Sequence, residues 1–324
     1  MNLSENSDKF ITFAVYLYMN GLTACRMKNK LINIKGRLFS LEKPVVMGIL
    51  NVSPDSFVAG SRQLNESDVT RRIETIISEG GAIIDVGGCS TRPGADAITL
   101  EEEWRRLEPA LNILKKNHAE IPVSIDTFRA DLAKRAVSAY GVDMVNDISG
   151  GVMDEKMFET VAALNVPYVL THFGDHTADH TADHTADHTA YHTAYHTANH
   201  PTDTDQFQEE VMICLAKKLQ ELRRIGINDV IVDPGFGFGK TLAQNYQLMR
   251  SLNRFSRLFD CPLLVGVSRK SMIYNLLDCS IDDSLNGTTV MHTYSLLNGA
   301  DILRVHDVKE AVEAVKLVEF LKDR

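Results

Sequence analysis

The side chains in this sequence that could do chemistry fall into a cationic set and a hydrogen-bonding set. Guanidinium and ammonium groups suit phosphate and pyrophosphate oxygens, because they present several charged N–H donors at once. Four cationic or titratable side chains could therefore hold an anion that carries several charges. They are Arg92, Lys270, Arg304 and His306.

The second set suits a flat heterocycle. Asp126, Asn146 and Asp233 could pair with amino and ring N–H groups, and they would be costly to leave unpaired if buried. Asn51, with Asp55 nearby, offers hard oxygen ligands suited to Mg²⁺ that bridges a pyrophosphate. The sequence shows no Ser-His-Asp or Cys-His nucleophile arrangement, so it points to binding and ionisation chemistry more than to covalent catalysis.

Eight short apolar runs must position these side chains, and most of the runs precede a helical pattern. The runs lack strict alternation, which is typical of buried parallel strands. Strand then helix, eight times, predicts a single-domain α/β fold, the (β/α)₈ TIM barrel. A doubly wound open sheet is the alternative, and eight units favour closure. The runs span 45–51, 82–88, 122–126, 143–147, 167–172, 229–235, 262–268 and 301–306.

Polar residues gather at the C-terminal ends of these runs. In a barrel that end carries the active site, and it brings together residues that are remote in sequence. Single members have a structural explanation, since Asp126 or Asn146 could cap the next helix and His306 could be a hydrogen-bonded core histidine. That explanation is far less plausible for the whole set. The same ends also carry Asp85, Asp147, His172 and Ser268.

Composition narrows the class of partner. The chain has 324 residues, 44% of them hydrophobic, with a net charge of −9 and a pI near 5.7. No concentrated run of Lys and Arg resembles a footprint for nucleic acid or anionic lipid, so we expect small-molecule substrates and neither a nucleic-acid nor a membrane partner. The five scattered cysteines indicate free thiols in a reducing compartment, which predicts a cytoplasmic protein.

The barrel is predicted to span residues 27–324. Residues 1–26 include an apolar run that ends in Leu-Thr-Ala-Cys at Cys25, as in a lipoprotein cleavage site, but they lack the positive start of a signal peptide. We expect residues 1–26 to be a dispensable extension, with a targeting segment as the alternative. No other stretch approaches the length of a transmembrane helix.

The segment PGFGFGKT, residues 234–241, resembles a phosphate-binding loop but has the wrong spacing. Only three residues separate Gly235 from Gly239, where that pattern needs four. We therefore expect a flexible strand-to-helix loop with Phe236 and Phe238 available for ring contact and Lys240 in solvent.

Seven motifs, in order, resemble the dihydropteroate synthase family, and the resemblance runs from about Leu31 to Leu321. It implies a TIM-barrel transferase of the folate pathway that joins 4-aminobenzoate to the pterin carbon carrying a diphosphate. It further implies release of pyrophosphate with Mg²⁺ bound, a homodimer and a target of sulfonamides. The motifs are VMGILNVSPDSF, IIDVGGCSTRPGA, VSIDTFRADLAKRAV, VNDISGG, DPGFGFGKTLAQNYQLM, LLVGVSRKSMI and ILRVHDVKEAVEAV.

The resemblance also implies roles for single residues. In such enzymes the diphosphate leaves first, and the neutral amine attacks the cationic pterin methylene that remains. The implied pterin pocket is Asp126, Asn146, Asp233 and Lys270. The implied diphosphate site is Arg92, Arg304 and His306, with Asn51 at the metal. The implied aminobenzoate side is Thr91, Pro93 and Ser271, under loops that carry Phe57 and Phe238. The implied catalytic residues are Lys270, Arg304, His306 and Asp126.

The sequence departs from the family at three positions near this site. Cys89 stands where the family commonly has Glu, and Thr171 and Phe173 stand where it usually has methionines. A corrinoid-dependent methyltransferase domain binds a pterin in a similar barrel, but it has no need of SRKS and RVHD. A metal-sequestering protein on an inactive barrel would show damaged anchor residues, and none is damaged.

Residues 175–203 hold a four-residue repeat with seven histidines from His176 to His200, in the loop after the fifth predicted strand. The segment is rich in Thr, Asp and His, so it cannot bury enough surface to offset the entropy of ordering. We interpret it as a passive low-complexity insertion with incidental affinity for Ni²⁺ or Zn²⁺. Replacing residues 175–202 with a short Gly/Ser linker should keep turnover within about tenfold, and a folded but inactive deletion protein would contradict this.

Overall fold

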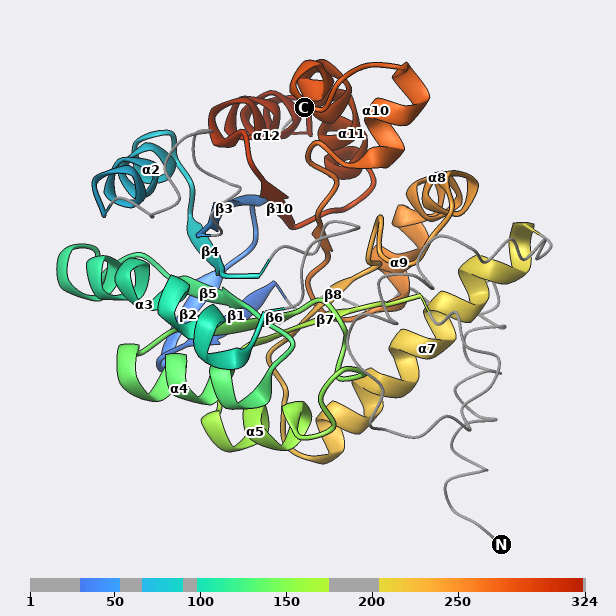
Figure 1. Ribbon diagram of the computed structural model, residues 1–324. Helices are drawn as coiled ribbons and strands as arrows, with labels where there is room; N and C mark the ends of the chain where they lie inside the picture. Colours follow the sequence, from blue (N-terminus) through green and yellow to red (C-terminus); the bar gives the residue numbers. More distant parts are fainter. Residues whose placement is uncertain (1–29, 53–65, 90–97, 175–203, 323–324) are drawn as a thin grey trace, which may run out of the picture.

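The predicted eight strands form one parallel sheet that closes into a barrel (Figure 1). The computed structural model describes residues 30–52, 66–89, 98–174 and 204–322. Neighbouring strands follow the order β8-β7-β6-β5-β4-β3-β10-β9, and a parallel bridge between Val232 and Leu263 joins the two ends. The predicted barrel is therefore confirmed, and the alternative of a doubly wound open sheet is wrong. Its strands are β3 (Val45–Asn51), β4 (Ile83–Gly87), β5 (Val123–Asp126), β6 (Met144–Asp147), β7 (Tyr168–Thr171), β8 (Val230–Asp233), β9 (Leu264–Val265) and β10 (Ile302–Val305).

Helices surround the sheet on its outer side (Figure 1). In α3, Thr99 caps the first turn by accepting from the Glu102 N–H, and Trp104, Leu107 and Leu111 lie on one buried face. The described helices are α2 (Glu66–Ser78), α3 (Leu100–Asn117), α4 (Ala130–Tyr140), α5 (Met157–Leu164), α7 (Thr204–Arg224), α8 (Leu242–Arg250), α9 (Leu252–Leu258), α10 (Ser271–Leu277), η2 (Asp282–Ser284), α11 (Leu285–Leu297) and α12 (Val308–Lys322). None of these helices has the length and apolar character that crossing a membrane requires.

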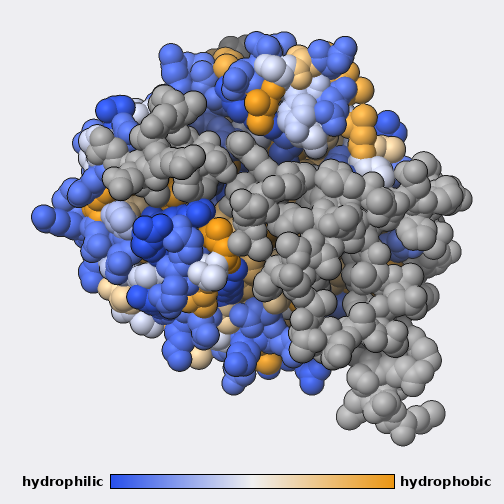
Figure 2. All heavy atoms as spheres, in the orientation of Figure 1, coloured by the Kyte–Doolittle hydropathy of each residue, from blue (hydrophilic) through white to orange (hydrophobic). Residues whose placement is uncertain are grey.

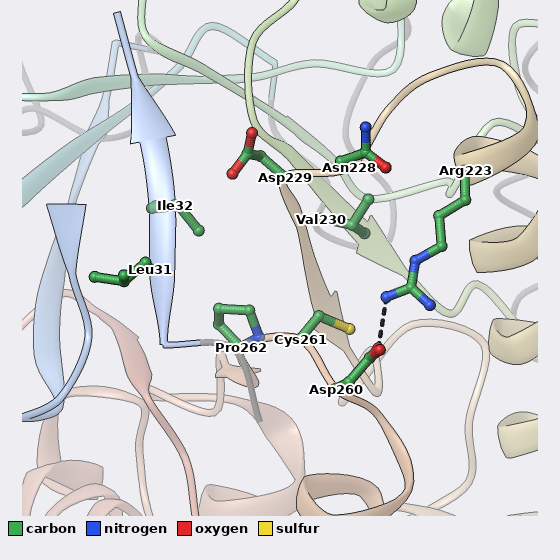
Figure 3. Close-up of a pocket in the computed structure, with 9 residues that line it drawn as sticks. All are labelled: Leu31, Ile32, Arg223, Asn228, Asp229, Val230, Asp260, Cys261 and Pro262. Atoms are coloured by element: carbon green, nitrogen blue, oxygen red, sulfur yellow. Dashed lines mark hydrogen bonds and ion pairs between the residues drawn. The ribbon is translucent and has the colours of Figure 1, made fainter. Parts of the chain in front are cut away.

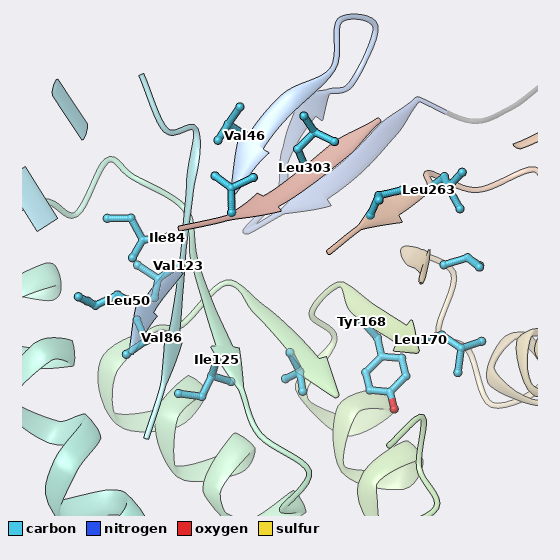
Figure 4. Close-up of a cluster of buried hydrophobic side chains, with 14 of the residues drawn as sticks. Val46, Leu50, Ile84, Val86, Val123, Ile125, Tyr168, Leu170, Leu263 and Leu303 are labelled. Carbon is cyan, nitrogen blue, oxygen red and sulfur yellow. The ribbon is translucent and has the colours of Figure 1, made fainter. Parts of the chain in front are cut away.

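The outward-facing strand residues pack against the helices in one large apolar cluster. Figure 4 shows part of this cluster, including Leu50 of β3, Ile84 of β4 and Leu170 of β7, which are all fully buried. The inward-facing residues form a second cluster inside the barrel. Because successive side chains of a strand point to opposite faces, every barrel strand except β5 contributes to both clusters, and β5 contributes Val123 and Ile125 to the outer one.

The inner face changes from apolar to polar along the strands. At the N-terminal level it is filled by Met47, Ile83, Met144, Val169, Ile231, Leu264 and Ile302. Two residues further along four of these strands, the same face carries Asp85, Asn146, Asp233 and Arg304. Asp126 lies level with Asn146 in the register of β5 and β6. The apolar layer therefore makes a floor beneath a polar mouth at the C-terminal ends of the strands.

An antiparallel hairpin, which the sequence analysis missed, covers the base of the barrel. It comprises β1 (Leu31–Ile34) and β2 (Arg37–Ser40). Ile32 and Ile34 alternate with exposed neighbours, and with Leu41 they belong to the inner apolar cluster. The turn places Lys35 and Gly36 at positive φ. The hairpin therefore closes the end of the barrel opposite the polar mouth.

A small cavity lies beside this hairpin, between Leu31 and Ile32 of β1 and the chain around the start of β8 (Figure 3). Its charged lining is already hydrogen-bonded, since Arg223 donates to Asp260 at 2.5 Å and Asp229 accepts from the Asn33 N–H at 2.9 Å. The cavity is at the N-terminal end of β8, away from the polar mouth, and we assign no function to it.

Two predicted segments lie outside the described residues. They are the extension 1–26 and the histidine repeat, which falls in sequence between β7 and α7.

The hairpin should contribute to stability through Ile32. Replacing this side chain, which is 1% exposed, with alanine (Ile32→Ala) removes buried methyl groups and should lower the free energy of unfolding by about 2–5 kcal/mol. Leu38→Ala on the same hairpin is the control, because Leu38 is 71% exposed. Urea denaturation measures both. Equal stabilities of the two variants would show that the hairpin does not pack as described.

Candidate active site

The guanidinium of Arg304 joins three strands at the barrel mouth. Its Nε donates to Asp85 Oδ2 at 2.6 Å, and its Nη2 donates to Asp126. Asn146 Nδ2 also donates to Asp85 Oδ2, at 2.9 Å. These bonds hold side chains from β10, β4, β5 and β6 in one cluster. A guanidinium has five N–H groups, and these contacts to carboxylates use two of them.

Burial and charge set opposite protonation tendencies in this cluster. Burial raises the pKa of Asp126 to about 7, although Arg304 beside it acts in the other direction. Burial alone would lower the pKa of Arg304, but Asp85 and Asp126 outweigh it and raise that pKa above its usual value. Arg304 therefore stays charged, while Asp126 can exist in either form near neutral pH.

Asp233 and Lys270 form the second polar pair of the mouth. Burial lowers the pKa of Lys270 to about 8. The Asp233 carboxylate has the opposite effect, because its negative charge favours the ammonium form. Burial raises the pKa of Asp233, and Lys270 opposes this. Lys270 Nζ donates to the Phe236 carbonyl at 2.5 Å and lies 4.2 Å from the centre of the Phe238 ring. That ring also stacks on Phe173. The Lys270 ammonium thus contacts a carbonyl and an aromatic face, and the Asp233 carboxylate is near enough to influence its pKa.

His306 and Ser271 lie at the edge of the same mouth. His306 follows β10, and Ser268 Oγ lies 3.2 Å from its Nδ1 and accepts from its backbone N–H at 3.1 Å. Arg269, next to Ser268, forms a two-point ion pair with Asp307, with both distances at 2.8 Å. This pair joins the loop after β9 to the loop after β10. Ser271 is exposed at the first position of α10.

Asn51 ends β3 at a position where it could contact a metal ion. A Cβ atom added to Gly87 would lie 3.3 Å from Asn51 Oδ1 and 3.5 Å from Asp126 Oδ2, so both oxygens face the same small residue. Within the described ranges, no group of three or more His, Cys, Asp or Glu side chains could hold a metal by itself. The oxygens of Asn51 and Asp126 fit a Mg²⁺ ion that takes most of its ligands from water and from substrate phosphates.

An ion pair fixes the residue that follows segment 90–97. Arg129 pairs with Glu103, which is fully buried, and Arg129 Nη2 donates to the Ile98 carbonyl at 2.6 Å. Thr127, next to Asp126, donates to Glu103 at 3.2 Å. Burial, with Glu103 nearby, raises the pKa of Cys89 to about 11. The Cys89 thiol is therefore neutral at pH 7 and does not supply the charge of the family's usual glutamate.

The structure brings together most of the residues that the sequence singled out. Those that converge at the mouth are Asn51, Asp126, Asn146, Asp233, Phe238, Lys270, Ser271, Arg304 and His306. Thr91, Arg92, Pro93 and Phe57 lie outside the described residues.

Three expectations were wrong or incomplete. Lys240 does not lie in solvent, because its Nζ donates to three backbone carbonyls. Phe236 is fully buried in the outer core and does not offer its ring to a ligand. The predicted site also omitted Asp85, although the sequence placed it near a strand end. Its inward direction two residues after Ile83 was the available signal.

Comparisons with known proteins identify the family of this chain. The family described as "Pterin binding enzyme" matches residues 47–306, so the barrel belongs to the pterin-binding enzymes. The dihydropteroate synthase of Clostridium beijerinckii is 35% identical over 287 residues, which cover 87% of this chain and 96% of that protein. By these matches, the chain belongs to the dihydropteroate synthase family.

Solved structures show the same relationship. The Xanthomonas albilineans dihydropteroate synthase with 4-aminobenzoic acid superposes with a TM-score of 0.77 at 32% identity, over 92% of this chain and 100% of that one. The Yersinia pestis dihydropteroate synthase in complex with a sulfonamide drug gives 0.78 at 32% identity, over 91% and 100%. The resemblance inferred from the seven motifs is confirmed.

Asp126 should make the stability of the unliganded protein depend on pH. Its pKa of about 7 in the folded chain exceeds the ordinary 3.8, so its contribution to stability is full below about pH 4 and is lost as the pH rises to 7. As the pH falls from 7 to 4, the free energy of unfolding of the wild type should therefore rise relative to that of Asp126→Asn, by up to about 1.4 kcal/mol per pH unit. Asp131→Asn, at an exposed carboxylate of α4, is the control. Parallel pH curves for wild type and Asp126→Asn would rule out the raised pKa.

Proposed function

We propose that this chain condenses (7,8-dihydropterin-6-yl)methyl diphosphate with 4-aminobenzoate to give 7,8-dihydropteroate and pyrophosphate. The observation that supports it most is the convergence at one mouth of hydrogen-bonding carboxylates and amide with cationic groups, linked through Arg304. The relatives named dihydropteroate synthase support the transferase class and favour it over a corrinoid-dependent methyltransferase.

The pterin ring binds at the carboxylate side of the mouth. Asp126 and Asp233 accept from its amino and ring N–H groups, and Asn146, oriented by Asp85, supplies an amide. Lys270 donates to a ring acceptor from its place between the Phe236 carbonyl and the Phe238 ring. These polar contacts fix the ring so that its methylene carbon faces the cationic side.

The cationic side binds the diphosphate. Arg304 contributes the N–H groups that its carboxylate partners do not use, and His306 and Arg92 add donors. The bond between the methylene carbon and the diphosphate oxygen breaks with its electron pair passing to that oxygen. The amine nitrogen of 4-aminobenzoate then forms a bond to the cationic methylene and loses a proton to water. Asp126 and Asp233, when ionised, stabilise the positive charge that develops on the pterin.

Asn51 would hold Mg²⁺ together with the diphosphate, and the ion would supply charge neutralisation for the leaving group. Asn51 Oδ1 orients that end of the substrate, and Gly87 leaves room for it beside Asp126. The residues proposed for the aminobenzoate side are Thr91, Pro93 and Ser271. Because the Yersinia pestis relative forms a complex with a sulfonamide drug, we propose that sulfonamides compete at this side.

Activity and pyrophosphate binding test this proposal together. Purified protein with the pterin diphosphate, labelled 4-aminobenzoate and Mg²⁺ should form dihydropteroate, and chelating the Mg²⁺ should slow the reaction. Arg304→Lys keeps a charge beside Asp85 and Asp126 but loses the planar fork, so pyrophosphate affinity should fall by about 1.5–3 kcal/mol.

Thermal unfolding with and without pyrophosphate measures that loss. Arg254→Lys, at an exposed arginine of α9, is the matched control and should keep the wild-type shift. No dihydropteroate from the wild type would overturn the proposed function, whereas equal protection of wild type and Arg304→Lys would overturn only the role of Arg304.

A homodimer is also part of the proposal. Exposed apolar side chains gather on the helices near the C-terminus, and Figure 2 shows hydrophobic atoms over this region at the upper right. Patches of this kind mark association surfaces. The residues are Leu276 and Leu277 of α10, Val290, Tyr294 and Leu297 of α11, and Leu317, Phe320 and Leu321 of α12.

The mass in solution tests the dimer. The 36.1 kDa chain should sediment at about twice that mass, because burying this surface removes apolar area from water. Val290→Asp should shift the protein to the monomer, while Leu38→Asp on the hairpin should not. A monomeric wild type would contradict the dimer.

We assign the protein to the cytoplasm. None of the four described cysteines, Cys89, Cys214, Cys261 and Cys279, is in a disulfide, which supports a reducing compartment. Association with membrane fractions in the native host would contradict this.

A further inference from the structure

The ammonium of Lys240 lies in a pocket of backbone oxygens. Its Nζ donates to the carbonyls of His172 at 2.9 Å, Gly235 at 2.7 Å and Phe238 at 2.9 Å. Three accepting carbonyls match the three N–H donors of an ammonium. Burial lowers the pKa of Lys240 to about 7, against Asp233, which raises it. The side chain therefore binds the protein backbone and is not oriented for solvent.

The three carbonyls belong to two different loops of the mouth. His172 directly follows β7, and the other two lie in the loop after β8. The loops touch closely at Gly235, where an added Cβ would lie 2.0 Å from the His172 carbonyl oxygen. Gly235 also has a φ of 74°, which favours glycine. Lys240 thus joins two loops that leave no room for a side chain between them.

The loop that Lys240 holds is the one that holds Lys270. Lys270 Nζ donates to the Phe236 carbonyl and lies over the Phe238 ring, and the Phe238 carbonyl accepts from Lys240. Gly237 lies between Phe236 and Phe238 in the sequence, and its N–H donates to Asn245 Oδ1 of α8 at 2.7 Å. The Lys270 ammonium therefore binds a turn that is itself held by two contacts. Lys240 binds the Phe238 carbonyl, and Asn245 of α8 binds the Gly237 N–H.

We propose that Lys240 is a positioning residue for substrate binding, which acts by fixing the Phe236–Phe238 turn and through it the Lys270 ammonium. It does not touch the substrate. This role rests on the proposed function, because the ligand that Lys270 contacts is the pterin ring. Without the Lys240 ammonium the turn can move away from His172, and the ring then loses part of the affinity that Lys270 provides.

A double-mutant cycle tests the proposal, because residues that act through one another are not additive. Lys240→Met keeps the length of the side chain and removes the charge and the donors. Titration calorimetry with pteroic acid measures binding in wild type, Lys240→Met, Lys270→Met and the double variant. Lys116→Met, at an exposed lysine of α3, controls for the lost charge.

Lys240→Met should weaken pteroic acid binding about tenfold in the wild-type background and less than twofold in the Lys270→Met background. Steady-state kinetics should show a higher KM for the pterin diphosphate with little change in kcat or in the KM for 4-aminobenzoate. A purely structural role would instead lower the unfolding temperature and affect both substrates alike. If Lys240→Met does not fold, Lys240→Gln, which keeps two N–H donors, enters the same cycle.

Equal effects of the Lys240 substitution in both backgrounds would overturn its action through Lys270. Unchanged affinity in Lys240→Met would also overturn the proposal. A wild-type chain that binds neither pteroic acid nor 4-aminobenzoate would instead contradict the proposed function, so the two failures are distinguishable.

Discussion

The arrangement of side chains at the barrel mouth depends on one buried interaction, in which the Arg304 guanidinium compensates the charges of two carboxylates. Removing charges from water costs several kcal/mol for each ion unless opposite charges and hydrogen bonds compensate. Arg304 contacts Asp85 and Asp126 together, and Asn146 contributes a further N–H to Asp85. Asp85 Oδ1 still has no hydrogen-bond partner among the described residues, so even this cluster is only partly satisfied. The strands that carry these residues must therefore stay in register for the charges to remain paired.

The barrel provides that register by separating two tasks along each strand. The N-terminal half of the inner face is apolar and is sealed by the β1–β2 hairpin, which excludes water from below. The C-terminal half carries the charges. Because the interior is closed on one side, the polar side chains can be solvated only from the mouth, where a substrate would replace the water. The pKa of Asp126 and the pKa of Lys270 are shifted toward neutral pH by the same burial.

The parts of this architecture that follow from local sequence were predictable. Eight repeated strand-helix units define a barrel, and polar residues at strand ends predict where they meet. The hairpin was missed because two strands of four residues each carry only a weak alternation pattern. Lys240 was misplaced for a different reason. A lysine in a glycine-rich loop normally extends into water, and nothing in the adjacent sequence shows that the His172 carbonyl, contributed by another loop, lies within its reach.

The same contacts explain how the chain can carry a long insertion beside its site. The entropy of closing a loop grows only slowly with its length, so a barrel loses little stability when one connection is extended. What matters is whether the residues before the insertion are held independently of it. β7 is paired on both sides, with β6 and β8, and the carbonyl of His172 at its end is bound by Lys240. On the far side, Lys218 of α7 donates to the Gly150 carbonyl at 2.8 Å. The described chain on each side of residues 175–203 is therefore fixed by contacts that do not involve the repeat, and a change in its length need not reach Lys270 or Arg304.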